Sequence, residues 1–421
     1  MTAGISLQHT LSRATIAESN EQQLVYVLLE ASPEGTITQL PKLPLNLCMV
    51  IDRSSSMRGE RLSQVKEAAG RIIDQLGQDD YFGLVTFNDR ADVLISAQRV
   101  TNRADLKQSF NRIEAAGGTE MARGMALGLQ EIQRPMLIRG INRLMILTDG
   151  RTYGDESTCV EIARRAQSRG IGITALGIGT EWNEDLLETM TANENSHTAY
   201  IQSAQEVSAV FANELKRMHS VFAQRVRLTI SVRPGGLLRS LDQVRPFIAS
   251  VPITETSEHN WSTPLPDWTG GDPQAFLLEV VVPPLNVGDQ PLLKIALHFD
   301  MPGANLKDQS RERIVRIAAR PADQVGYQID STVKYWLERL MAYRLQARAW
   351  KDIKSGRLEE ASRNLQMAGT RLFGAGEAQL AQTVQDEATR LLRNGSTSEE
   401  GRKRIKFGTR GLMGAPTSEH E

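Results

Sequence analysis

Three short segments of this chain carry oxygen-bearing side chains that could bind a small divalent cation. They are Asp52-Arg53-Ser54-Ser55-Ser56, Gly117-Gly118-Thr119 and Thr148-Asp149-Gly150. Carboxylate and hydroxyl oxygens suit Mg²⁺ or Mn²⁺, and the lack of thiolate and imidazole groups in these segments disfavours zinc, iron and copper. Because the hydroxyls are neutral, a bound cation would keep positive character and open positions in its octahedral shell. An acidic group from a partner could complete such a site.

The elements around these segments explain how residues so far apart in sequence could meet. Each segment ends or follows a run that is typical of a strand, and a parallel sheet brings the carboxyl ends of its strands to one edge, where open α/β folds place their ligand sites. The run Leu45–Ile51 is nearly all apolar, as in a strand that is buried on both faces of a parallel sheet. Apolar residues then recur at helical spacing from Leu62 to Leu76.

Strand-like and helical patterns continue to alternate from Leu45 to about Ser220. Helices are expected to begin near Met121 and Glu156. Further strands are expected at Phe82–Phe87, Val93–Ile95, Leu144–Leu147 and Ile173–Ile178. The alternation predicts a doubly wound, mostly parallel α/β sheet with a Rossmann-like layout.

With these three segments in this order, the chain resembles the metal-ion-dependent adhesion site (MIDAS) of von Willebrand factor A (VWA) domains. The resemblance implies that Ser54, Ser56 and Thr119 coordinate the metal through their hydroxyls. It also implies that Asp52 and Asp149 coordinate it directly or through water, and all five positions match the family pattern. The first segment alone would be a weak signal, because a capped loop before a helix has the same composition. The three segments together make a specific motif.

A fourth segment indicates which subgroup of VWA proteins the chain resembles. Gly177-Ile178-Gly179 fails the dinucleotide-binding pattern, because Trp182 stands where the third glycine belongs. Together with the residues that follow Trp182, it is instead similar to a bacterial subgroup of VWA proteins that is labelled as similar to calcium-activated chloride channels. That label does not imply channel activity.

The segments on either side of the α/β region have a different pattern. A strand is expected before it at Gln23–Glu30, and strands are expected after it at Arg225–Val232, Ala275–Val282 and Leu292–Phe299, with Pro- and Gly-rich turns between them. These strands predict an antiparallel β-sandwich into which the VWA domain is inserted. The expected boundaries are residues 1–43 for the first strands of the sandwich, 44–220 for the VWA domain and 221–322 for the remainder of the sandwich.

The C-terminal part is expected to be helical and then disordered. Residues 323–393 carry three amphipathic patterns, which predict a helical region. Residues 394–421 are polar, with basic side chains at their centre, and this composition predicts a disordered basic tail. In that tail, Thr409 is a possible phosphosite that a phosphothreonine reader could bind. One alternative is that the unmodified basic tail docks on an acidic surface of the same protein and that phosphorylation releases it. A passive tail is the reading that the composition favours.

Composition limits the classes of partner and compartment. The chain has 421 residues and a formal net charge of −1, which gives no general attraction to nucleic acid or to an anionic membrane. Cys48 and Cys159 lie in apolar or helical patterns, so a disulfide framework is not expected. Neither a signal peptide nor an apolar run long enough to span a bilayer is recognised. These features predict a cytoplasmic protein without a membrane or nucleic-acid partner.

Enzyme motifs are poorly matched. No GxSxG elbow surrounds the serines, and Asp52-Arg53-Ser54 lacks the second Asp of a haloacid-dehalogenase nucleophile. A metal-dependent hydrolase is therefore the least favoured reading, and we expect no enzymatic activity. The favoured hypothesis is a Mg²⁺-dependent module that captures an Asp or Glu of a protein partner and acts as an intracellular scaffold or assembly factor. The alternative is an accessory subunit of an AAA+ ATPase in a chelatase-like system, whose ATPase would be a separate chain because this one has no GxxxxGK[ST] loop.

Overall fold

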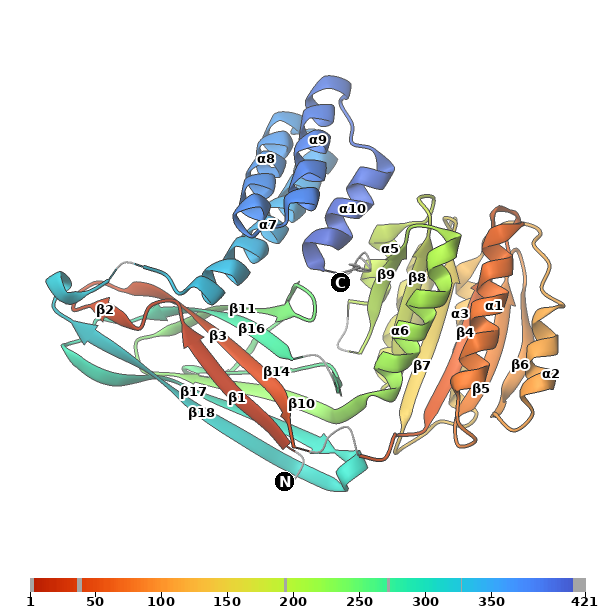
Figure 1. Ribbon diagram of the computed structural model, residues 1–421, viewed down its shortest axis with the longest axis horizontal. Helices are drawn as coiled ribbons and strands as arrows, with labels where there is room; N and C mark the ends of the chain where they lie inside the picture. The colour runs from red at the N-terminus through yellow and green to blue at the C-terminus, as the bar shows by residue number, and fades with distance from the viewer. Residues whose placement is uncertain (1–3, 36–39, 193–194, 271–272, 327, 412–421) are drawn as a thin grey trace, which may run out of the picture. The chain divides into compact units, whose positions relative to one another are not determined.

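The chain folds into two compact units, one of which is inserted in the other (Figure 1). The inserted unit, here called the α/β unit, spans Pro41–Val221, and the sandwich unit is formed by the residues before Pro41 together with Phe222–Gly411. The structure is a computed structural model. It describes residues 4–35, 40–192, 195–270, 273–326 and 328–411.

The α/β unit is built on one mixed sheet. Its strands are β4 (Leu45–Asp52), β5 (Tyr81–Phe87), β6 (Ala91–Arg99), β7 (Ile141–Thr148), β8 (Gly172–Ile178) and β9 (His197–Ile201). Their spatial order is β6-β5-β4-β7-β8-β9, with β6 antiparallel to β5 and every other pair parallel. Every residue of β4 is buried, as expected of a central strand covered on both faces. The predicted doubly wound α/β fold is confirmed, and β9 is an addition to it.

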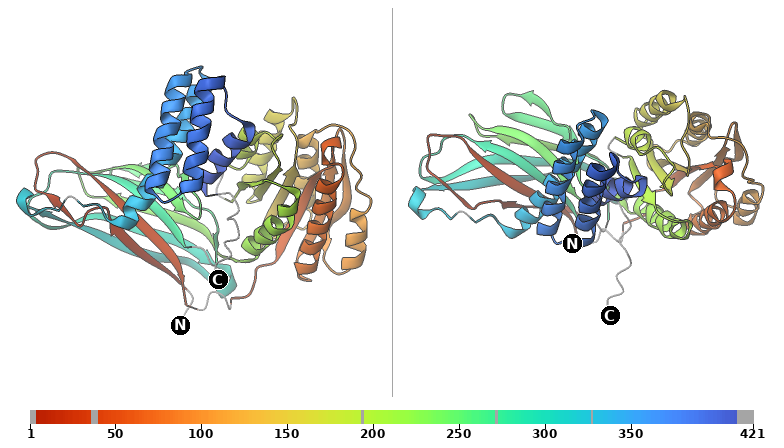
Figure 2. Two further views of the ribbon diagram at one scale, coloured as in Figure 1. Left: turned by 45° about the horizontal axis from the view of Figure 1, so that its top comes forward. Right: turned by 90° about the horizontal axis from the view of Figure 1, so that it is seen from above.

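Helices cover both faces of this sheet (Figure 2). They are α1 (Glu60–Gln75), α2 (Arg103–Phe110), α3 (Met121–Gln133), α4 (Glu156–Gln167), α5 (Glu184–Met190) and α6 (Val207–His219). Helices α1, α2 and α6 share one apolar core with the sheet, and α3 lies on the other face. There α3 approaches closely at Gly128, where an added Cβ would come within 2.5 Å of the Val50 side chain and 2.8 Å of the Leu144 side chain.

The order of the strands creates a switch point at β4. From β4 the chain passes to β5 on one side, and it later returns to β7 on the other side. The connections that leave the carboxyl ends of β4 and β7 therefore diverge. In open α/β sheets this divergence forms the crevice in which ligands bind, and here it falls at Asp52 and Thr148, the last residues of the two strands.

The sandwich unit contains two sheets that enclose an apolar core. The first sheet has, in spatial order, β1 (Gly4–Leu11), β3 (Gln23–Glu34), β16 (Gln274–Val282), β11 (Leu237–Arg245) and β12 (Ala249–Ser250). The second has β13 (Thr254–Ser257), β14 (Asn260–Pro264), β10 (Val221–Val232), β17 (Gly288–Met301), β18 (Leu306–Arg320) and β2 (Thr15–Ala17), with β15 (Trp268–Thr269) paired to β10.

Strand pairing confirms the predicted insertion. Strand β3, which precedes the α/β unit, pairs antiparallel with β16, which follows it. Side chains on one face of this pair, among them Val27 and Phe276, lie in the core between the two sheets with Leu228 and Leu297. One pairing departs from the antiparallel prediction, because the short strand β2 runs parallel to the end of β18.

Four helices follow the sandwich within the described residues: α7 (Ser331–Lys354), α8 (Leu358–Gly374), α9 (Ala378–Asn394) and α10 (Glu399–Arg410). The first three are the predicted amphipathic helices. Val333 and Leu340 of α7 pack against Leu28 and Leu277 on the outer face of the first sheet, while α8 and α9 share a core of their own with α7. No helix in the described ranges is both long and apolar enough to span a bilayer.

Helix α10 corrects the prediction of a disordered tail from residue 394. It begins after Ser398, whose hydroxyl accepts a hydrogen bond from Gly401 N at 2.9 Å, and it ends at Gly411 in a left-handed conformation (φ 75°). Ile405 is fully buried in the helical core. The prediction relied on composition alone, whereas the segment also carries a Ser N-cap, two glutamates in the first turn and a Gly stop.

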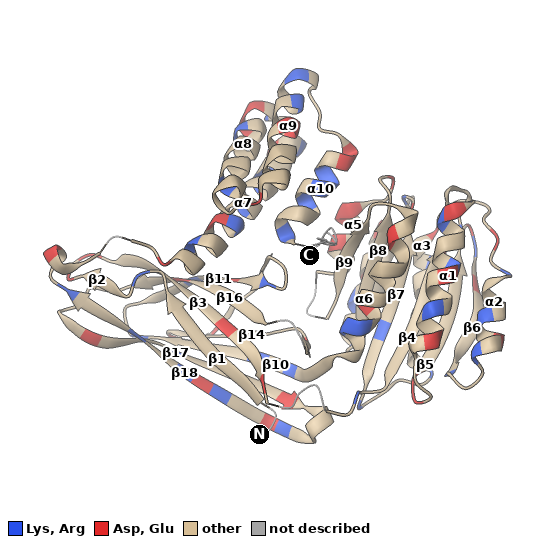
Figure 3. Cartoon of the chain, viewed as in Figure 1, with Lys and Arg blue, Asp and Glu red and all other residues tan. Residues whose placement is uncertain are grey.

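The predicted phosphosite is affected by the same correction. Thr409 lies on α10 with only 1% of its surface exposed, and its hydroxyl donates to the Lys406 carbonyl at 3.4 Å. The prediction that this threonine is accessible in a disordered segment was therefore wrong. The basic residues of the segment belong to the same helix (Figure 3). Residues 412–421, the rest of the predicted tail, lie outside the described residues.

Candidate metal site

Asp52 anchors the site at the carboxyl end of β4. Its Oδ1 accepts a hydrogen bond from Ser54 N at 2.8 Å, and its Oδ2 accepts one from the Thr148 hydroxyl at 2.7 Å. Because Thr148 ends β7, the second bond ties the two strands together at the switch point. The Asp52 side chain is completely buried.

The hydroxyls of the first segment lead from Asp52 to Asp149. Ser54 Oγ and Ser56 Oγ are 3.0 Å apart, and the Ser56 hydroxyl donates to Asp149 Oδ1 at 2.7 Å. Asp149 is buried, while Ser56 lies at the surface in a single 3₁₀ turn, Ser55–Met57. The two segments, nearly a hundred residues apart in sequence, thus form one continuous chain of oxygen atoms.

Thr119 enters through a loop that is bonded to the first segment. Ser55 N donates to the Gly117 carbonyl at 3.0 Å, and Gly117 adopts φ 78°, which glycine tolerates best. A Cβ placed on Gly150 would lie 3.4 Å from Thr119 Oγ1 and 3.7 Å from Ser56 Oγ. Glycine at 150 therefore leaves open the space that these two hydroxyls border. The structure brings all five predicted residues together.

The types of these oxygens suit a small hard divalent cation. Neighbouring ligands of an octahedral ion with bonds of about 2.1 Å lie about 3.0 Å apart, which matches the separation of Ser54 Oγ and Ser56 Oγ. Among the described residues, no cluster of three or more His, Cys, Asp or Glu side chains could hold a metal. A site in this region would thus depend on hydroxyls and two carboxylates, which is a set for a hard cation.

Burial removes the Asp52 and Asp149 side chains from water and so disfavours charge at the site. It raises the pKa of Asp52 to about 6, hydrogen bonds from Ser54 and Thr148 oppose that increase, and the neighbouring Asp149 adds to it. Two carboxylates are thus held close together where water cannot solvate them well. Positive charge placed beside Asp52 would favour its ionised form.

Sequence reasoning missed Arg61, which supplies positive charge to the site. Arg61 lies in the first turn of α1, and its Nη1 donates to Asp149 Oδ2 at 2.7 Å. The Asp149 side chain is buried, while 38% of the Arg61 side chain is exposed. The sequence contains a signal for this contact. Arg61 lies in the first turn of the helix that directly follows the segment Asp52–Ser56, and a residue at that position can face the segment.

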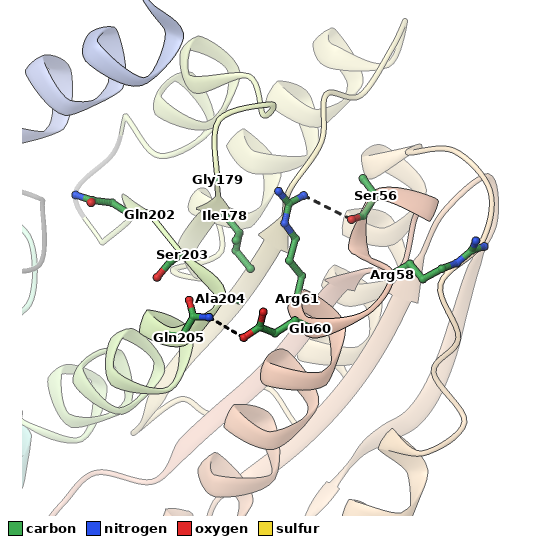
Figure 4. A pocket seen from close by; sticks show the side chains of 10 residues that line it. All are labelled: Ser56, Arg58, Glu60, Arg61, Ile178, Gly179, Gln202, Ser203, Ala204 and Gln205. Carbon is green, nitrogen blue, oxygen red and sulfur yellow. Dashed lines mark hydrogen bonds between the residues drawn. The ribbon is translucent and has the colours of Figure 1, made fainter.

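A pocket of about 510 Å³ opens beside these residues (Figure 4). It lies over the start of α1 and the segments that follow β8 and β9. Ser56 and Arg61 line it together with Gln202, Ser203 and Gln205. The candidate site is therefore continuous with a polar hollow on the same unit.

Comparison with protein families divides the chain in agreement with this architecture. Residues 46–213 match the von Willebrand factor type A domain, and residues 331–415 match the Sll0103-like, C-terminal alpha-helical domain. The second match includes all four C-terminal helices. The chain is therefore a VWA domain protein with an Sll0103-like C-terminal helical domain, and VWA domains are in general modules of protein interaction.

Relatives share this organisation to different extents. The protein sll0103 of Synechocystis sp. is 27% identical over 90% of this chain and 91% of its own length. YfbK of Escherichia coli is 23% identical over 51% of this chain and 38% of its own length. Inter-alpha-trypsin inhibitor heavy chain H4 of Bos taurus is 31% identical over 36% of this chain and 18% of its own length.

Solved structures support the fold of the whole chain. A von Willebrand factor type A protein from Catenulispora acidiphila aligns with a TM-score of 0.73 at 17% identity, covering 96% of both chains. The ArnB paralog VWA2 from Sulfolobus acidocaldarius aligns with a TM-score of 0.57 at 14% identity, covering 97% of this chain and 98% of its own. At these identities the likeness concerns the fold alone.

Proposed function

We propose that the VWA domain of this protein binds Mg²⁺ or Mn²⁺ and uses it to capture an acidic side chain of a protein partner. The metal would be held by the hydroxyls of Ser54, Ser56 and Thr119 and by the carboxylates of Asp52 and Asp149. The protein would act through this site as a scaffold or assembly factor. The observation that carries the proposal is the continuous set of oxygens around two buried carboxylates at the switch point of the sheet.

The chemistry of the ligands supports an acidic partner. A divalent cation held by three neutral hydroxyls and two carboxylates would supply a Lewis-acidic position for one more anionic oxygen. The side chains of the protein keep that position at the surface, since Ser56 is exposed and Thr119 is partly exposed. An Asp or Glu that projects from a partner can reach it without any opening of the domain.

Titration calorimetry with Mg²⁺ tests the metal site. Wild type is expected to bind Mg²⁺, and Asp52→Ala is expected to lose the binding while its circular dichroism spectrum stays unchanged. Asp92→Ala is the matched control, because Asp92 is exposed and pairs with Arg53 outside the ligand set. Wild-type protein that binds neither Mg²⁺ nor Mn²⁺ would overturn the proposal.

Affinity capture from the native host tests the partner. Proteins retained by wild type in Mg²⁺ but released by EDTA, and not retained by Asp52→Ala, are the expected ligands. Replacing the acidic residues at their contact surface should abolish the capture. An AAA+ ATPase among these ligands would favour the alternative of an accessory subunit, whereas capture that persists in EDTA would place the interface away from the metal site.

A further inference from the structure

Arg61 holds a position that neither the motif nor the proposed ligand set explains. Its guanidinium reaches the buried Asp149 from the solvent side and donates to Oδ2 at 2.7 Å, while the Ser56 hydroxyl binds the other carboxylate oxygen at the same distance. Arg61 also approaches the Ser56 carbonyl at 3.5 Å. It is therefore bonded to two of the three segments that form the site.

The Arg61 guanidinium and a bound divalent cation would compete for the same carboxylate, that of Asp149. Both are positive, and at separations of a few ångströms their repulsion is strong where water is partly excluded. The Arg61 side chain is long and 38% exposed, so it can leave Asp149 without disrupting the core. The adjoining pocket, which Arg61 lines, offers open volume for the displaced side chain.

The pocket has the polarity of a site for an acidic peptide. Arg61 and Arg58 line it, along with neutral polar residues, and its acidic residue Glu60 is already engaged by Gln205 Nε2 at 2.6 Å. Figure 4 shows the Arg61 side chain directed toward Ser56 at the metal site, while Arg58 points away from both. Arg61 thus stands where the metal site and the pocket meet.

We infer that Arg61 is the specificity residue of the acidic-ligand site. Without a ligand it neutralises Asp149 and competes with the metal. When an acidic side chain arrives, the guanidinium transfers to that carboxylate, so that one ligand oxygen faces the metal and the other accepts from Arg61. The adjoining peptide of the partner then occupies the pocket. This inference rests on the proposed function, and it makes the binding of metal and acidic ligand cooperative.

The planar fork of arginine suits this role better than the point charge of lysine. A guanidinium presents several N–H donors in fixed directions and can bind a carboxylate in a bidentate manner. Arg61→Lys would keep the positive charge but lose that geometry. The lysine variant should therefore still compete with the metal for Asp149. An acidic ligand should tighten its metal binding much less than it does in wild type.

Calorimetric titration of the full chain with Mg²⁺, alone and in the presence of N-acetyl-glutamate amide, tests the inference. Arg61→Ala is expected to bind Mg²⁺ alone roughly tenfold more tightly than wild type. In wild type the acidic probe should tighten Mg²⁺ binding, and in Arg61→Ala that tightening should be lost. N-acetyl-glutamine amide, which carries no charge, should have no effect on either protein.

Arg71→Ala is the matched control, because Arg71 lies on the same helix, pairs with the exposed Glu67 and does not line the pocket, and it should behave as wild type. Equal Mg²⁺ affinity in wild type and Arg61→Ala, with an undiminished effect of the probe, would overturn the role of Arg61 while leaving the metal site intact. Absence of Mg²⁺ binding in both would overturn the proposed function itself. If Arg61→Ala fails to fold, Arg61→Lys and Arg61→Gln decide the question by the same two titrations.

Discussion

The two edges of the α/β sheet bury acidic side chains in opposite electrostatic settings. At the carboxyl edge, Asp52 is bound by neutral donors and lies near a second acid, Asp149, and its pKa is raised to about 6, chiefly by burial. At the amino edge, Glu214 of α6 is also buried, yet it pairs with His197 at 2.8 Å and Arg217 at 3.5 Å. Burial alone would raise the pKa of Glu214, but these two partners lower it to about 2.

Asp80 is a second buried acid at the amino edge whose pKa is lowered. It precedes β5, and its carboxylate accepts hydrogen bonds from Leu45 N at 2.8 Å and Gly77 N at 2.7 Å, and lies 3.2 Å from His219 Nε2. Burial opposes ionisation of Asp80, but the hydrogen bonds outweigh it and lower its pKa.

The difference separates acids that stabilise the domain from acids that we propose as metal ligands. At the amino edge, hydrogen-bond donors and ion-pair partners favour the ionised form of each carboxylate, so the charge contributes to stability. At the carboxyl edge, a carboxylate pair is held with less compensation, which costs stability that binding of a cation would offset. The same sheet thus carries stabilising acids at one edge and, in our proposal, its binding chemistry at the other.

The largest effect is expected at the carboxyl edge, on metal binding. Asp149→Asn should weaken Mg²⁺ binding by roughly 100-fold or more, since ligating carboxylates matter at least as much as their supporting groups. Its free energy of unfolding without metal should stay within about 1 kcal/mol of wild type, because the partner that it loses, Arg61, can turn to solvent. Calorimetry and urea unfolding measure the two quantities. Unchanged Mg²⁺ affinity would remove Asp149 from the ligand set.

The amino edge should respond with a loss of stability. Asp80→Ala leaves the N–H groups of Leu45 and Gly77 without their acceptor, and should lower the free energy of unfolding by about 2 kcal/mol. Asp79→Ala, one residue away and exposed, should change it by less than about 0.5 kcal/mol. Urea unfolding compares the pair. If the two variants were equally stable, the proposed division between the edges would fail.

The lowered pKa of Glu214 predicts acid sensitivity. An unfolded glutamate has a pKa near about 4.3, so between that value and about 2 the unfolded chain binds more protons than the folded one. The contribution of Glu214 to the free energy of unfolding should therefore be fully present above about pH 5 and be lost progressively as the pH falls through this window.

Urea titrations at a series of pH values test this expectation with Glu214→Gln, in which the decline should be smaller. Glu67→Gln is the control, because Glu67 forms an exposed pair with Arg71 and should leave the pH profile unchanged. An identical acid decline in Glu214→Gln and wild type would show that other groups cause it.

The smallest effect should have the opposite sign. Asp52→Asn removes a buried charge, and without metal it should raise the free energy of unfolding at neutral pH by about 1 kcal/mol. Saturating Mg²⁺ should reverse the order, since only wild type gains stability from binding. Thermal unfolding in EDTA and in Mg²⁺ measures both states. A loss of stability in EDTA would mean that Asp52 belongs with the stabilising acids.

Local patterns in the sequence identified much of this architecture. The apolar run of β4, the alternation that follows it and the three oxygen-rich segments were sufficient to predict the VWA domain, and they selected five residues that the structure places close together. The insertion could be predicted because period-2 strands flank the helical alternation on both sides. Helix α10 has local signals as well, at Ser398 and Gly411, but the polar and basic composition of the segment opposes them.

Tertiary structure decided the charges around the site. The sequence determined which side chains could bind a cation, because ligand type is a property of each residue. It did not determine that Arg61 would meet Asp149, or that Glu214 would meet His197 while Asp52 would meet neutral donors. Those pairings join residues from different elements, and the pKa of a buried acid depends on which donors and charges the packed elements place within a few ångströms of it.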